Sequence, residues 1–86
     1  MKYNKPIIEF DGRLFSYTIA SDIVRNGLGA ELNEIVNGKE VYVAEVFRND
    51  TNLKIKFNTF EANLPYAALV KLIEVFELEV THEFDV

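Results

Sequence analysis

Two dipeptides, Asp11-Gly12 and Asn37-Gly38, constrain the fold of this chain more than any other feature. Each stands between two runs that are rich in β-branched and aromatic residues. Glycine tolerates the positive φ that a tight hairpin turn needs, so such pairs are strong hairpin signals. The sequence therefore predicts β-hairpins at 11–12 and 37–38.

Three further segments extend this prediction to a sheet of about five strands. A polar break over 49–52 precedes 53–59, where apolar and polar side chains alternate as in a strand with one buried face. The segment 40–48 is apolar on both parities, which is typical of a central strand. The segment 20–29 leaves two interpretations open: a short helical turn capped by Ser21, or a loop that enters the next strand.

One helix is predicted at about 64–77, with Asn63 as N-cap and Pro65 in the first turn. Its core-facing stripe is predicted from the helical spacing as Tyr66, Leu69, Val70, Ile73 and Phe76, widened by Ala68, Leu72 and Val75. The chain is thus expected to adopt an α+β fold, an antiparallel β-sheet with this C-terminal helix packed on one face.

The last residues alternate in polarity, with apolar side chains and His82 on one parity and carboxylates or Thr81 on the other. This pattern predicts a terminal strand over 78–85. No glycine or proline separates it from the helix, so a helix that runs to Val80 and a short tail is the alternative. If the strand forms, its outer face is a row of carboxylates.

The chain of 86 residues is long enough for one domain, 1–86, and too short for two cores. It has no cysteine, which excludes disulfides and thiolate metal sites and favours a reducing compartment. The basic residues at the start have no apolar run behind them, which argues against a signal peptide, and no stretch approaches the run of about 18 apolar residues of a membrane span. We therefore expect a cytoplasmic protein that does not span a membrane.

Catalytic signatures are sparse, and we expect neither an enzyme nor a cofactor. His82 is the one histidine, and neither Ser16 nor Ser21 lies in a nucleophile-elbow pattern. Gly27-Leu28-Gly29 is too short for a dinucleotide fingerprint. The C-terminal carboxylates lack the spacing of a calcium loop, so no metal site is predicted.

The net charge of −5 is unevenly distributed, because 1–73 carries nine acidic and nine basic residues and is formally neutral. The whole excess lies in 74–86, where it would repel nucleic acid phosphates. Carboxylates beside aromatic residues instead suit a basic protein partner, which they steer electrostatically while a buried aromatic supplies binding energy. The candidate partner-binding residues are Glu74, Glu77, Glu79, Glu83, Phe84 and Asp85.

Arg25 and Arg48 each have a carboxylate nearby in the sequence, Asp22 and Asp50 respectively. We expect surface ion pairs at both places, and such pairs contribute about 0–1 kcal/mol.

The stretches 27–32, VAEVFRND at 43–50 and NLPYAALVKLIEVF at 63–76 resemble a pattern in small bacterial proteins, in which a β-meander feeds one C-terminal helix. In size and charge the chain is also similar to the immunity proteins of contact-dependent and other polymorphic toxin systems. That resemblance implies a protein without catalytic residues that binds a basic toxin domain, often a nuclease, one to one and occludes it. It assigns no binding residue.

The alternative is a self-associating structural or regulatory module that forms a homodimer. The apolar arc of the predicted helix is broader than one sheet face needs, so a second subunit is one way to cover it.

Overall fold

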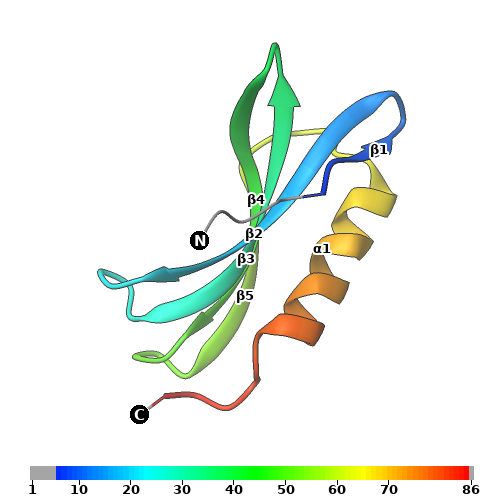
Figure 1. Cartoon of the computed structure of the whole chain (residues 1–86). Helices are drawn as coiled ribbons and strands as arrows, with labels where there is room; N and C mark the ends of the chain where they lie inside the picture. The colour runs from blue at the N-terminus through cyan, green and yellow to red at the C-terminus, as the bar shows by residue number, and fades with distance from the viewer. Residues whose placement is uncertain (1–5, 86) are drawn as a thin grey trace.

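The structure is a computed structural model that describes residues 6–85. Five strands form one antiparallel sheet in the order of the sequence, and one helix follows them. The elements are β1 (Ile8–Phe10), β2 (Arg13–Asp22), β3 (Gly27–Val36), β4 (Lys39–Asn49), β5 (Lys54–Thr59) and α1 (Tyr66–Glu79). Figure 1 shows the strongly twisted sheet with α1 on one side of it. The predicted α+β fold is confirmed.

The two glycine turns close hairpins as predicted. Asp11 and Gly12 both adopt positive φ between β1 and β2, and Asn37 and Gly38 do so between β3 and β4. The segment 20–29 is also a hairpin, because β2 continues to Asp22 and a four-residue turn leads into β3. Of the two interpretations left open there, the loop that enters the next strand is the correct one.

A β-bulge in β4 decides which side chains reach each face of the sheet. Leu32 pairs with Ala44 and Asn33 pairs with Tyr42, so Val43 is an extra residue on β4. Val43 and Ala44 consequently both enter the core with the helix. Beyond the bulge Tyr42 shares a face with Glu45, although the two residues have opposite parity. The apolar character of β4 on both parities thus reflects a bulge as well as its position between β3 and β5.

The core lies between the sheet and α1, whose buried residues Ala68, Leu72 and Phe76 recur every four positions and lead to the buried Val80. Ala68 is small enough to let the helix backbone approach β2, where the Tyr17 hydroxyl donates a hydrogen bond to the Ala68 carbonyl at 3.0 Å. Burial raises the pKa of Tyr17, so this hydroxyl keeps its proton at neutral pH.

Part of the predicted core stripe is wrong, because Tyr66, Val70 and Ile73 are exposed on the outer side of α1. The predicted Phe76 is buried, and Leu69 is partly buried against the core. The predicted helix forms, but its buried face is centred on Leu72 and includes the small Ala68.

The ends of α1 also differ from the prediction. The N-cap is Pro65 with no side-chain cap, whereas Asn63 adopts a positive φ and its carbonyl accepts a hydrogen bond from Arg13 Nη1. At the other end the helix continues to Glu79, and 80–85 forms no strand. The predicted strand over 78–85 is therefore wrong, and the alternative of a helix end with a short tail is correct. Burial of Val80 one turn after Phe76 favours the helical course over the alternating pattern.

Candidate functional site

The sheet face opposite α1 is here called the helix-free face. On this face an aromatic ring packs over two glycines. Phe47 on β4 faces Gly27 and Gly29 on β3, and a Cβ on either glycine would lie 2.5 Å or 2.9 Å from the ring. Only a residue without a side chain leaves this space free. Gly27 and Gly29, which are too few for a dinucleotide-binding motif, thus have a packing role beneath Phe47.

Arg25, from the turn between β2 and β3, lies over this ring. Its guanidinium carbon is 3.9 Å from the centroid of Phe47, which is cation–π geometry. Nη1 and Nη2 donate hydrogen bonds to the two carboxylate oxygens of Glu45 at 2.7 Å and 2.9 Å, and Nε donates to Asp22 at 2.6 Å. The three nitrogens of the guanidinium are therefore all engaged within the protein.

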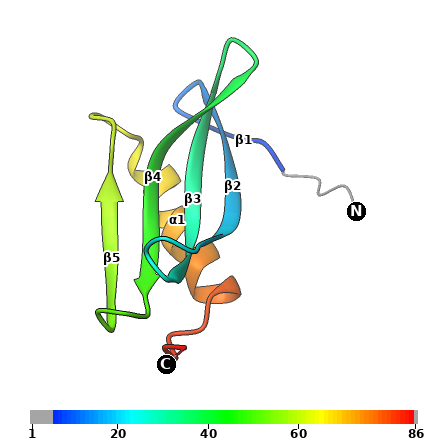
Figure 2. The same cartoon turned by 90° about the vertical axis from the view of Figure 1, so that its left-hand side faces the viewer.

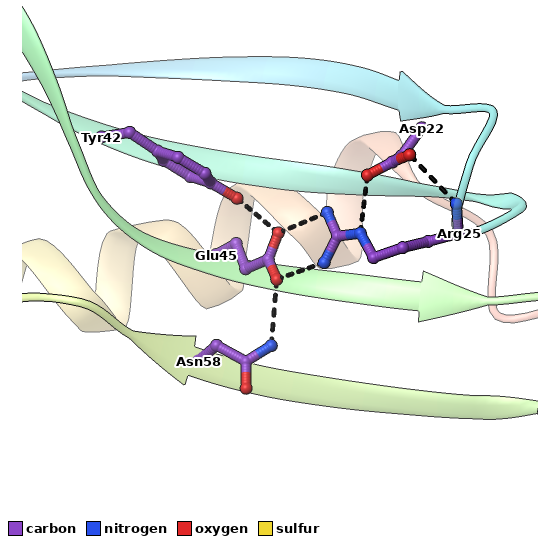
Figure 3. A network of polar contacts seen from close by, with 5 residues as sticks. All are labelled: Asp22, Arg25, Tyr42, Glu45 and Asn58. Carbon is purple, nitrogen blue, oxygen red and sulfur yellow. Dashed lines mark hydrogen bonds and ion pairs between the residues drawn. The ribbon is translucent and has the colours of Figure 1, made fainter.

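Glu45 is the centre of this arrangement and is only 2% exposed. Besides Arg25, it accepts hydrogen bonds from the Tyr42 hydroxyl and from Asn58 Nδ2, the latter at 2.9 Å. Figure 3 shows these side chains converging on the carboxylate from β4, β5 and the β2–β3 turn. We call the five residues Asp22, Arg25, Tyr42, Glu45 and Asn58 the Glu45 network.

The ionisation of the network follows from its contacts. Burial alone would raise the pKa of Glu45, but hydrogen bonds from Arg25, Tyr42 and Asn58 outweigh it and hold that pKa below its ordinary value. Burial, and next the hydrogen bond to Glu45, raises the pKa of Tyr42. At neutral pH Glu45 is thus a carboxylate and Tyr42 a phenol. A buried carboxylate with a lowered pKa and every partner in place is a poor general base, so the network serves to fix three segments together.

The network should make the protein sensitive to acid. Because the folded-state pKa of Glu45 lies below its ordinary value of 4.5, its contribution to stability is present above that pH and is lost as the pH falls through the folded-state pKa. The lowered pKa values of Asp22, hydrogen-bonded by Arg25, and Glu34, hydrogen-bonded by Arg13, have the same sign. We expect the free energy of unfolding, measured in urea, to fall progressively below about pH 4.5.

The matched variants are Glu45→Gln and Glu9→Gln. Glu45→Gln should lower the free energy of unfolding by about 2 kcal/mol at neutral pH and flatten the decline in acid, because the charge-assisted hydrogen bonds are absent at every pH. Glu9 is exposed on β1, so its replacement should leave both quantities near the wild-type values. An unchanged acid decline in Glu45→Gln would contradict this role for Glu45.

Beside the network, the helix-free face is hollowed over about 210 Å³. The residues that line this β5 hollow are Arg25, Phe47, Asn49, Asn52, Lys54, Lys56 and Asn58. They provide cations and amides around an aromatic floor, with no carboxylate among them. Arg25 is neutralised by its partners, but Lys54 and Lys56 have no ion pair within residues 6–85. The hollow therefore presents positive charge on an acidic protein.

A larger hollow, of about 690 Å³, lies between α1 and the β1–β2 edge. Its lining is mostly apolar and includes Tyr17, Ile19 and Val75, with Glu79 among the polar residues. Pro6, the first residue that the structure describes, is part of this lining.

The predicted partner-binding residues do not form one row. Because α1 continues to Glu79, Glu77 and Glu79 project from different sides of the helix rather than from one strand face. Glu77 lies 2.6 Å from His82 Nε2, and Glu74 pairs with Lys71 at 2.9 Å. The other members of the predicted set are the exposed Glu79, Glu83 and Asp85 and the half-buried Phe84. Phe76, the second aromatic of this region, belongs to the core and is not available to a partner.

Both predicted arginine pairs form, but neither is a simple surface pair. Arg25 binds Glu45 as well as Asp22. Arg48 and Asp50 are buried, with Nε–Oδ1 and Nη2–Oδ2 distances of 2.9 Å and 3.2 Å. The surface location expected for Arg48 is wrong because β4 turns it toward the tail that follows α1, where Nη1 donates a hydrogen bond to the Thr81 carbonyl.

Comparison with protein-family models, with curated proteins and with solved structures finds no match for this chain. Residues 6–85 contain no helix with the length and apolar character needed to cross a bilayer. Over the same residues no three His, Cys, Asp or Glu side chains are grouped so as to hold a metal ion.

Proposed function

We propose that this protein acts by binding another protein, and that it neutralises a basic toxin domain in the manner of an immunity protein. The observation that carries the proposal is that the arginines form ion pairs within the fold, whereas several exposed carboxylates at the end of α1 have no ion pair within residues 6–85. Each arginine in the described chain is paired within the fold, to Glu34, to Asp22 and Glu45, or to Asp50. The body of the domain thereby uses its arginines and their carboxylate partners for its own stability.

Some of the exposed carboxylates that have no ion pair within residues 6–85 gather where α1 ends, whereas Glu9, Asp11 and Glu61 lie on β1, in the β1–β2 turn and after β5. Within residues 6–85, Glu79, Glu83 and Asp85 have no ion-pair partner, and Glu74 and Glu77 are exposed beside them in the sequence. We call the set Glu74, Glu77, Glu79, Glu83, Phe84 and Asp85 the acidic end. Leu78, 75% exposed, lies among these carboxylates and supplies an apolar contact that suits the centre of an interface.

The mechanism under this proposal is occlusion rather than chemistry. A basic toxin domain that cleaves a nucleic acid presents a positive groove, and the acidic end would be drawn to that groove by long-range attraction. Contacts of Leu78 and Phe84 would then hold the complex. Binding of one chain across the groove would exclude the substrate, so the inhibitor needs no catalytic group.

Charge reversal tests the proposed surface. We compare Glu83→Lys/Asp85→Lys with the control Glu9→Lys/Glu61→Lys, which changes the net charge equally at exposed sites elsewhere. The partner is recovered with the tagged wild-type chain from its native lysate, and association rates are then measured with the purified partner at several salt concentrations. The first variant should associate about tenfold or more slowly and lose most of the salt dependence. The control should stay within about threefold of the wild type.

Two results would count against the acidic end. Equal slowing by both variants would assign the effect to net charge alone. Unchanged association of Glu83→Lys/Asp85→Lys would place the interface elsewhere on the domain.

A second candidate function, the self-associating module, is favoured by the outer side of α1. Tyr66, Val70 and Ile73 are exposed there at helical spacing and form an apolar stripe that the sheet does not cover. Sedimentation of the purified chain at low micromolar concentration separates a homodimer from a monomer, and Ile73→Glu distinguishes the stripe from other contacts.

A further inference from the structure

The strand β5 forms one edge of the sheet and is bordered by another strand on one side only. It pairs with β4, from Ala44↔Thr59 to Asn49↔Lys54, and the strand order ends with it. Its residues are exposed except for the half-buried Asn58. Figure 2 shows β5 lying beyond the strands that α1 covers. Such an edge presents a row of main-chain donors and acceptors to any extended segment that approaches it.

The two faces of β5 have opposite character. Lys54, Lys56 and Asn58 point to the helix-free face and line the β5 hollow. Ile55 and Phe57 point to the other face, where they are 38% and 47% exposed because α1 packs over β2, β3 and β4. The edge therefore alternates between positive charge without a partner in residues 6–85 and uncovered apolar surface.

A second copy of β5 does not suit this edge. If two β5 strands paired side by side, the lysines of one would face the lysines of the other on the same side of the sheet, and like charges opposite each other destabilise a strand pair. Lysines on an edge strand are a known means of preventing self-pairing. The segment that fits carries carboxylates where this strand carries lysines.

We propose that β5 accepts, as a sixth strand, an extended segment of a partner protein in which acidic and apolar side chains alternate. The acidic side chains of that segment lie over the β5 hollow, near Lys54, Lys56 and the Asn58 amide. Its apolar side chains cover Ile55 and Phe57. Main-chain hydrogen bonds to the edge supply affinity, and the alternation supplies specificity and register.

The Glu45 network prepares this site. Its member Asn58 donates to Glu45 from β5, and Asn58 and Arg25 both line the hollow. Both side chains are held by hydrogen bonds before a partner arrives, so on binding the ordering cost falls on Lys54 and Lys56. The proposal concerns the β5 edge and does not depend on the acidic end being an interface.

Nucleic acid is the competing occupant of a lysine-lined hollow. Phosphate-backbone binding draws on many lysines and arginines. The hollow offers only Lys54 and Lys56 as cations without an ion pair within residues 6–85, and the chain carries a net charge of −5. An extended acidic segment also uses Ile55, Phe57 and the strand edge, which a phosphate backbone leaves unused.

The probe is a capped synthetic peptide of alternating glutamate and valine, titrated into the isotope-labelled full chain and followed by amide NMR shifts and amide exchange. We expect shifts confined to β5 and to the residues that line the hollow, together with slower exchange of amides in Lys54–Thr59. A matched peptide with lysine in place of glutamate should not bind. A peptide with N-methyl groups on alternate amides, which cannot complete the ladder, should bind at least about tenfold more weakly.

Charge reversal on the protein completes the test. Lys54→Glu/Lys56→Glu should weaken the glutamate–valine peptide by about tenfold and allow the lysine–valine peptide to bind instead. The control Lys39→Glu/Lys71→Glu has the same change in net charge and should bind like the wild type. Absence of binding at millimolar peptide, shifts away from β5, or equal binding by the N-methylated peptide would overturn the proposal. A short single-stranded oligonucleotide that produced the same shifts would overturn it in favour of phosphate binding.

Discussion

Replacement of Gly27 by alanine is expected to lower the free energy of unfolding by about 4 kcal/mol, which is near the upper end for a single substitution. A Cβ at this position would lie 2.0 Å from the carbonyl oxygen of Arg48 and 2.5 Å from the Phe47 ring. The ring could move, but the carbonyl belongs to the main chain of β4. The residue pairs of β3 and β4 next to Gly27 would have to move apart to make room for the Cβ.

The control for this prediction is Gly38→Ala. Gly38 adopts a φ of +78°, but a Cβ there has no neighbour within 4 Å. Alanine at Gly38 should therefore cost about 1–2 kcal/mol, from the strained backbone alone. Urea unfolding of both variants measures the difference. Equal losses would mean that the close approach of the Arg48 carbonyl and the Phe47 ring does not determine the requirement for glycine at position 27.

The displaced ring should also affect the site. Phe47 supports the guanidinium of Arg25, which in turn holds the buried carboxylate of Glu45. In a folded Gly27→Ala protein we therefore expect altered amide shifts at Arg25 and Glu45, as well as lower stability.

The elements that could be predicted from the sequence depend on local signals. The turns at Gly12 and Gly38 need a positive φ, and that need is visible in two adjacent residues. The bulge at Val43 has no such signal, because it depends on how β3 and β4 register after the turn between them has closed. The apolar residues of β4 indicated a strand between neighbours, but they could not show which residue was inserted.

The tail illustrates a conflict between two periodicities. Residues 77–86 alternate strictly, which predicts a strand, yet Leu72, Phe76 and Val80 also recur every four positions. Burial of Val80 in the core beneath the sheet favours the helical period for α1, and that tertiary contact cannot be read from the ten residues themselves. The carboxylates of the acidic end are consequently spread around the helix end and the tail.

The Glu45 network shows the same limit at the candidate site. The pair Asp22–Arg25 is three residues apart and could be expected from the sequence. Glu45 lies twenty residues from Arg25 and thirteen from Asn58, so it joins them only after three hairpins have formed. A glutamate between Ala44 and Val46, in a strand that is apolar on both faces, was the one available signal of a buried charge.

Replacement of Arg48 by alanine is expected to lower the free energy of unfolding by about 3–4 kcal/mol, because it leaves the carboxylate of Asp50 buried without its partner. The two side chains are 7% and 5% exposed and form two hydrogen bonds between them. Arg48 Nη1 also donates to the Thr81 carbonyl at 2.9 Å. Loss of this contact should speed amide exchange over 81–85 beyond what the lower stability accounts for.

The double variant Arg48→Met/Asp50→Asn distinguishes two causes of lost stability, an unpaired buried charge and lost packing. It removes both charges while keeping similar volumes, so it should be about 2 kcal/mol more stable than Arg48→Ala, as measured by urea unfolding. Its tail should still exchange quickly, since methionine cannot donate to the Thr81 carbonyl. If the double variant were no more stable than Arg48→Ala, the unpaired carboxylate would not be the cause of the loss. If its tail were as protected as the wild type, Arg48 would not be what holds 81–85 against the sheet.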